Sequence, residues 1–180
     1  MRYIVVLFLL VVTTVIQAQE IKWMTMGEAL AAQEKEPRKI IMDAYTVWCG
    51  PCKLLDKNTF TNPDLVNFVN ENYYPVKFNA EGAEEINYKG EVYSNPNHDP
   101  ARATRRNSQH HFASALGLQG YPSIVFFDEK GGFIQPIVGY FTAQQLEIYL
   151  KMIENDDYKT LITQEAWQSY QEEFVGTFKG

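Results

Sequence analysis

The hexapeptide Trp48-Cys49-Gly50-Pro51-Cys52-Lys53 contains both cysteines of this 180-residue chain and separates them by two residues. A disulfide across so short a loop contributes little to stability, because loop-closure entropy grows with loop length. Two neighbouring thiols are better suited to chemistry, since one sulfur can attack a partner and the other can then displace it. The spacing therefore predicts thiol–disulfide exchange at Cys49 and Cys52.

The residues around the pair indicate which sulfur attacks. Residues 39–45 form an apolar strand, and Gly50-Pro51 then begins a helix that we expect to reach about Asn58. Cys49 would lie at the helix amino terminus, where free N–H groups and the macrodipole favour an anion. Such a position lowers a thiol pKa from roughly 8.5 into the range of about 3.5–7.5, and the thiolate is the nucleophile. Pro51 suits the first helical turn, where its missing N–H costs no hydrogen bond.

A zinc site is the main alternative for a cysteine pair. Structural zinc requires four ligands, and the remaining candidates are His98, His110 and His111, with no second cysteine pair. Adjacent histidines on a helix point in different directions, which does not favour a shared metal. We therefore predict no metal site and no cofactor other than the redox-active Cys49–Cys52 disulfide.

Residues 40–53, including the complete Trp-Cys-Gly-Pro-Cys-Lys motif, resemble the active-site strand and helix of the thioredoxin family. Residues 57–66 are similar to the periplasmic carboxy-terminal domain of the disulfide reductase DsbD. The resemblance extends over residues 24–153. It implies an α/β thioredoxin fold, with a central mixed sheet and helices on both faces, and a catalytic role for the two cysteines.

The same resemblance implies a proton-handling pair beneath the cysteines. Asp43, six residues before Cys49, matches a buried acid that moves protons for the second cysteine. Lys77 matches the strand lysine near that acid. Burial would raise the pKa of Asp43 by desolvation. On the residues alone, Asp43 could also be a surface carboxylate and Lys77 a solvated strand lysine.

A partner-binding surface is also implied. Tyr121-Pro122-Ser123 matches the cis-proline loop of the family, and a glycine after the last hairpin flanks the surface that meets the partner. Tyr121 departs from the residue typical of cytosolic members, so the choice of partner is a separate question. The residues assigned to this surface are Trp48, Gly50, Pro51, Tyr121, Pro122 and Gly139.

The amino terminus predicts export. Residues 1–18 have a charged start at Arg2, an apolar core too short to span a bilayer comfortably, and a small residue before the expected cleavage point, as in a signal peptide. An uncleaved anchor is the alternative. Two cysteines in an exported chain agree with an oxidising compartment, which in a Gram-negative bacterium is the periplasm. The net charge of −6 argues against nucleic-acid binding.

These observations predict an enzyme that reduces disulfides in exported proteins. The family resemblance implies a membrane electron donor of the DsbD type. Gly-Pro between the cysteines favours a reductant, whereas the oxidising compartment favours an oxidase or isomerase. A binding module that keeps the fold without turnover belongs to a different class. Two intact thiols argue against it, because a pure binder does not need them.

The chain is predicted to contain a thioredoxin-like domain at residues 19–154, with an insertion at 80–107, and a helical extension at 155–180. The insertion contains a small hairpin near residues 88–93 and is either a surface loop or a lid beside Cys49. In the extension, Trp167, Tyr170 and Phe174 have helical spacing, which indicates packing or a partner-docking helix. Further predicted helices occupy 27–35, 108–116 and stretches beginning at Asn62 and Thr142, and further strands 73–79, 123–128 and 133–138.

Overall fold

The computed structural model describes residues 20–180, and the predicted signal peptide at 1–18 lies outside the described residues. Within this part of the chain, no helix is long and apolar enough to cross a membrane. The helices and strands, with η for 3-10 and π turns, are α1 (Met26–Gln33), β1 (Lys39–Tyr45), α2 (Gly50–Leu54), η1 (Leu55–Thr59), α3 (Pro63–Asn72), β2 (Tyr73–Asn79), β3 (Ile86–Tyr88), β4 (Glu91–Tyr93), η2 (Pro100–Arg102), α4 (His111–Ala115), β5 (Ser123–Phe127), β6 (Phe133–Val138), α5 (Ala143–Glu154), η3 (Asp157–Lys159) and α6 (Gln164–Glu173).

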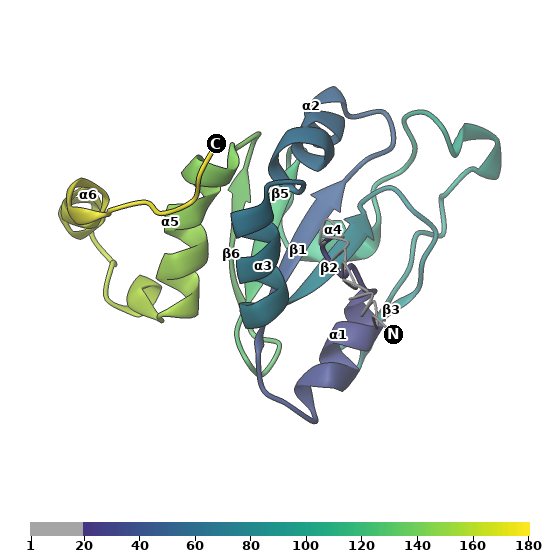
Figure 1. Ribbon diagram of the computed structural model, residues 1–180. Helices are drawn as coiled ribbons and strands as arrows, with labels where there is room; N and C mark the ends of the chain where they lie inside the picture. The colour runs from purple at the N-terminus through teal and green to yellow at the C-terminus, as the bar shows by residue number, and fades with distance from the viewer. Residues whose placement is uncertain (1–19) are drawn as a thin grey trace, which may run out of the picture.

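A four-stranded mixed sheet forms the centre of the molecule, with the order β2-β1-β5-β6 (Figure 1). β1 runs parallel to β2 and antiparallel to β5, and β5 forms an antiparallel pair with β6. Near the end of β1, Ala44 is paired with Phe78 on one side and with Ser123 on the other. The loops after β1 and before β5 therefore leave the sheet at the same edge.

Helices cover both faces of the sheet, as the sequence predicts. Successive strand side chains point to opposite faces, so Met42 of β1 packs with α1 and α4 while Ile41 packs with η1, α3 and α5. Asp43 lies two residues after Ile41 in β1, so the two side chains point to the same face of the sheet. Its carboxyl is therefore directed to the face that η1, α3 and α5 cover.

Local sequence signals determine where most helices begin. Thr25 and Thr142 form capping boxes with Glu28 and Gln145, respectively. Asn62 accepts hydrogen bonds from the first turn of α3. These helix starts and the strand at residues 39–45 are as predicted.

The motif helix extends about as far as predicted, because α2 continues directly into the π-helical turn η1, which ends at Thr59. One helix prediction is wrong in its start. The helix expected from Ser108 begins only at His111, because the buried His110 ring caps it. Nδ1 of His110 accepts the N–H of Phe112 at 3.0 Å, and Nε2 lies 2.6 Å from the carbonyl oxygen of Glu84. Both ring nitrogens are thus occupied within the fold.

The insertion at 80–107 divides into two parts. Its hairpin, β3–β4, turns at Lys89-Gly90 and buries Ile86 and Tyr88 in the core formed with α1 and α4. Buried Asn95 then donates hydrogen bonds to the carbonyl oxygens of Gly82 and Ser108, which joins the two ends of the following loop. The first part of the insertion therefore belongs to the domain core, and only residues after Asn95 form a surface loop.

The extension after α5 folds back on the domain, on the side of the molecule opposite the insertion (Figure 1). The Trp167 ring lies 5.5 Å from that of Tyr149 on α5, and the Tyr170 hydroxyl donates to Asp157 at 3.0 Å. The helically spaced aromatic residues thus pack against the domain's own helix.

Candidate active site

Three segments meet at the edge of the sheet where β1 ends and β5 begins. They are the loop from β1 to α2, the loop ending at Pro122, and the end of β6. Ser123 is paired with Val138, and the N–H of Gly139 donates to the carbonyl oxygen of Pro122 at 2.9 Å. The topology thus brings the cysteine motif, the proline loop and Gly139 together at one edge.

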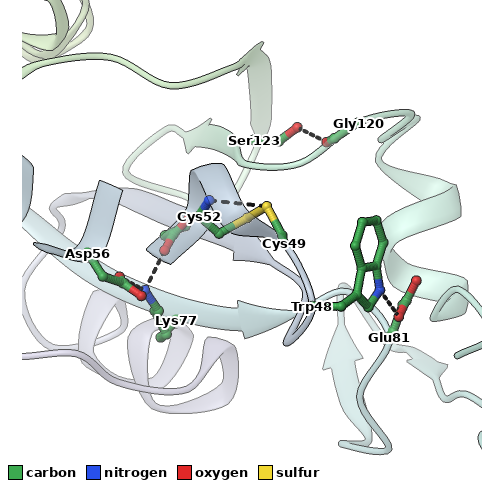
Figure 2. Close-up of a disulfide and its surroundings, with 9 residues drawn as sticks. Trp48, Cys49, Cys52, Asp56, Lys77, Glu81, Gly120 and Ser123 are labelled. Carbon is green, nitrogen blue, oxygen red and sulfur yellow. Dashed lines mark hydrogen bonds and ion pairs between the residues drawn. A yellow bond between two sulfur atoms is a disulfide. The ribbon is translucent and has the colours of Figure 1, made fainter. Parts of the chain in front are cut away.

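Cys49 and Cys52 form a disulfide at the amino terminus of α2 (Figure 2). Cys49 is the N-cap residue, and its sulfur accepts the N–H of Cys52 at 3.1 Å. Both cysteines are buried, each 2% exposed, whereas Gly50 and Pro51 between them are exposed. This arrangement places Cys49 where a helix stabilises a negative charge.

Asp43 and Lys77 face each other across β1 and β2. They are register partners, and Lys77 Nζ lies 2.6 Å from Asp43 Oδ2, with Asp56 of η1 as a second ion-pair partner (Figure 2). Burial raises the pKa of Asp43 to about 6, although the Lys77 charge acts to lower it. Burial would lower the pKa of Lys77, but its two carboxylate partners hold that pKa above its ordinary value.

Aromatic rings surround the Lys77 ammonium. Its Nζ lies 5.0 Å from the ring centroids of Trp23 and Tyr45 and 5.4 Å from that of Phe60. Cation–π contacts favour the charged amine. A charged lysine is therefore held beneath α2, on the sheet face to which Asp43 is directed.

The Tyr121–Pro122 peptide bond is cis, which the family resemblance implies. The Ser123 hydroxyl donates to the Gly120 carbonyl oxygen at 2.7 Å and closes this loop (Figure 2). Gly139 has φ +121°, a conformation that side chains with a Cβ rarely adopt. Burial raises the pKa of Tyr121 to about 12, so its hydroxyl stays protonated.

Trp48 is held between two residues of the insertion. Its indole N–H donates to Glu81 at 2.7 Å, and the Arg106 guanidinium lies 4.2 Å from the ring centroid. Figure 2 shows Trp48 and Glu81 on one side of the disulfide, and Lys77 and Asp56 on the other. The insertion therefore contacts the residue that immediately precedes Cys49.

Asp56, Glu81 and Arg106 also surround the site, although the sequence did not identify them as site residues. Asp56 follows Cys52 by four residues, so helical periodicity could have placed it on the same side of the helix. Glu81 follows the end of β2, which lies at the same sheet edge as the end of β1. Arg106 has no comparable signal, because a long loop determines its position.

A mixed sheet with helices on both faces and a Cys-x-x-Cys disulfide at a helix amino terminus define the class of thiol–disulfide oxidoreductases. The family model of the thioredoxin-like domain matches residues 26–154, and the chain belongs to this family.

One curated relative and two solved structures indicate what the chain is similar to. The thiol:disulfide interchange protein DsbD of Pectobacterium atrosepticum is 26% identical over 123 residues, which cover 67% of this chain but only 17% of DsbD. A thioredoxin-fold protein from Helicobacter pylori superposes with a TM-score of 0.58 at 16% identity, covering 81% of this chain and 93% of that one. The DsbH oxidoreductase superposes with a TM-score of 0.52 at 17% identity, covering 79% and 88%. The two superpositions establish the thioredoxin fold.

Proposed function

We propose that the protein is an extracytoplasmic thiol–disulfide oxidoreductase that reduces disulfides in exported proteins. The observation that carries this proposal is the position of the Cys49–Cys52 disulfide. Cys49 caps a helix, and its sulfur already accepts a backbone N–H from Cys52 at 3.1 Å. When the disulfide is reduced, the same N–H and the helix dipole stabilise a Cys49 thiolate.

The first step is attack by the Cys49 thiolate on one sulfur of a partner disulfide. A bond forms between Cys49 and that sulfur, and the other partner sulfur leaves as a thiolate. The partner segment lies against the edge formed by Pro122 and Gly139, with Trp48 beside it. We assign further roles in partner binding to Gly50 and Pro51, which lie between the cysteines, and to Tyr121, which precedes Pro122.

The second step releases the partner. Cys52 gives its proton to Asp43, and the resulting thiolate attacks the Cys49 sulfur of the mixed disulfide. The Cys49–Cys52 disulfide forms, and the remaining partner sulfur leaves as a thiolate, so two electrons have passed to the partner. The raised pKa of Asp43, about 6, suits a group that takes up a proton near neutral pH. Lys77 acts as a positioning residue that holds the Asp43 carboxylate.

The oxidised protein then needs an electron donor. A membrane carrier of the DsbD type fits an exported protein, because cytosolic reductants do not reach it. The similarity to a stretch of DsbD supports this choice of donor. The predicted signal peptide at residues 1–18 supports a periplasmic location in a Gram-negative source, and protease protection in intact cells tests that location.

The direction of the reaction is tested by the reduction potential of Cys49–Cys52, measured by equilibration with a thiol buffer. We expect a value near that of thioredoxin, about −270 mV, rather than the roughly −120 mV of a strong oxidant. The Gly-Pro dipeptide supports the reducing direction. A value near the oxidising end would overturn the reductase assignment and make the protein an oxidase or isomerase.

Reduction of insulin by the dithiothreitol-reduced protein tests enzymatic turnover. Cys49→Ser should be inactive, and Cys52→Ala should accumulate mixed disulfides on Cys49 that identify the partners by mass spectrometry. If the wild type were as inert as Cys49→Ser, the protein would be a binding module.

A further inference from the structure

The surface loop of the insertion carries a cluster of three arginines, of which Arg106 contacts the residue before Cys49. Arg102, Arg105 and Arg106 are exposed, and within residues 20–180 none of them forms an ion pair with a carboxylate. By contrast, Arg38 is paired with Glu36. The cluster is therefore a positive surface with unsatisfied charge.

Hydrogen bonds hold this loop in one shape. Asn107 accepts the N–H of Asp99 at 2.9 Å and donates to its carbonyl oxygen at 2.8 Å, which closes the loop 99–107. The N–H of Asn107 donates to Glu81 at 2.9 Å, and this same carboxylate oxygen accepts the Trp48 indole N–H. The Glu81 carboxylate thus connects the loop to Trp48, the residue that precedes Cys49.

The position of Arg106 connects the cluster to the chemistry. Its guanidinium lies over the Trp48 ring at 4.2 Å, and Trp48 directly precedes the attacking cysteine. A turn hydrogen bond from the N–H of Arg105 to the carbonyl oxygen of Arg102 keeps the two other arginines in the same short segment. A polypeptide bound across the disulfide toward Trp48 would meet this segment.

The sign of the arginine cluster is opposite to that of the chain's net charge. The chain has a net charge of −6, which repels an acidic partner at long range. Salt screens charges beyond about 8 Å at physiological ionic strength, so the charges beside the disulfide decide docking. Loop 99–107 contains these three arginines and one acidic residue, Asp99, so its own net charge is positive.

We propose that loop 99–107 is a docking surface for partner segments that carry acidic side chains next to their disulfide. This inference rests on the proposed reductase function and specifies its substrate class. Guanidinium groups bind carboxylates through paired N–H donors, so an acidic flank would be both attracted and oriented. The loop contributes specificity, and the cysteines perform the exchange.

Two synthetic disulfide peptides of the same length test the proposal, one with glutamate and one with lysine residues flanking the disulfide. The second-order rate of reduction by the reduced full chain is measured for each. We expect the wild type to favour the acidic peptide, and the preference to fall as sodium chloride is added. The double variant Arg102→Gln/Arg105→Gln should lose on the order of fivefold of this preference.

Lys89→Gln/Lys130→Gln is the matched control, because it removes the same charge from exposed lysines. Lys89 follows Tyr88, and Lys130 precedes Gly131. The Tyr88 hydroxyl donates to the Gly131 carbonyl oxygen, so both lysines lie near the carboxyl end of β5, whereas the active site lies at its amino end. An equal loss in both double variants, or equal wild-type rates on the two peptides, would overturn the docking role and leave the reductase function intact. A wild type inert toward both peptides would overturn the proposed function, and the docking role with it.

Discussion

Lys77 Nζ lies 2.6 Å from Oδ2 of Asp43, while Oδ1 of the same carboxyl has no hydrogen-bond partner within residues 20–180. A buried carboxylate with one bare oxygen is poorly stabilised in its charged form. Desolvation therefore outweighs the attraction of Lys77, and the pKa of Asp43 rises to about 6. The ion pair holds the carboxyl in place without fixing its charge.

Replacement of Asp43 by asparagine should stabilise the oxidised protein at neutral pH. The pKa of Asp43 is about 6 in the folded state against an ordinary value of 3.8, so between these values the folded state binds more protons than the unfolded state. Stability consequently falls as the pH rises through this window and stays lower above it. We expect Asp43→Asn to exceed the wild type by about 3 kcal/mol above pH 7 and to match it below about pH 4.

Urea unfolding of both oxidised proteins between pH 4 and pH 8 measures this difference. A gap that stayed constant across the range would contradict the elevated pKa. The activity of Asp43→Asn should be lower than that of the wild type. Asparagine cannot accept the Cys52 proton, so release of the partner from the mixed disulfide should be slower.

Lys77→Met should move the pH dependence of turnover upward. The Lys77 charge lowers the pKa of Asp43, so its removal should raise the inflection from about 6 by about 1–3 units. Asp56→Asn is the opposite control, because the Asp56 charge raises the pKa of Asp43 and its loss should lower the inflection. The rate of insulin reduction from pH 5 to pH 9 gives each inflection. Shifts in the same direction for both variants would rule out this electrostatic account.

Much of the fold could be predicted because its signals are local. Thr25, Asn62 and Thr142 satisfy the N–H groups of the turns that follow them, and this requires only a polar side chain at the helix start. The apolar strand 39–45 likewise needs only its own composition. In contrast, the start of α4 depends on His110, whose ring reaches Glu84 across the fold. No helix-start rule identifies a histidine that is buried by residues far away in the chain.

In the candidate site, too, residues in local motifs could be predicted, whereas contacts between distant segments could not. The family pattern indicated Cys49, Cys52, Asp43 and Pro122, because each has a fixed place in a motif. The contact between Trp48 and Arg106 joins the motif to a loop that the thioredoxin pattern lacks. The conformation of that loop depends on hydrogen bonds between residues distant in sequence, such as Asn107 to Glu81. Sequence spacing alone could not distinguish a free surface loop from one fastened to the active site.

Gly139→Ala should destabilise the protein, whereas Gly27→Ala should stabilise it. Gly139 has φ +121°, where an added Cβ causes strain of about 1–2 kcal/mol. Gly27 lies in α1 with open space around it, so alanine there should add about 0.5–1 kcal/mol through helix propensity. Thermal unfolding of the two variants measures both effects. A Gly139→Ala variant as stable as the wild type would show that the Gly139 backbone relaxes without cost.

The carboxyl-terminal segment is held by the buried carboxylate of Glu147 and by Asn62 and Asp64, which form hydrogen bonds with the Lys179 backbone at 2.6 and 2.8 Å. Glu147 of α5 accepts the N–H of Thr177 at 2.7 Å and the N–H of Phe178 at 2.9 Å, and it is paired with Lys151 at 2.7 Å. Burial would raise the pKa of Glu147, but Lys151 and these N–H groups bring it below its ordinary value. The Phe178 ring then packs 5.8 Å from that of Phe68 on α3.

Glu147→Gln should loosen this segment without affecting catalysis. An amide has one acceptor oxygen and no charge, so one of the two backbone hydrogen bonds, from Thr177 or from Phe178, is lost, at a cost of about 1–3 kcal/mol. Chymotrypsin should then cleave after Phe174 and Phe178 faster than in the wild type, while Glu165→Gln, an exposed change on α6, should have no effect. Insulin reduction should stay unchanged, because the segment lies on the side of the molecule away from the insertion (Figure 1). A loss of activity in Glu147→Gln but not in Glu165→Gln would instead mean that the extension supports the active-site edge through α3 and α5.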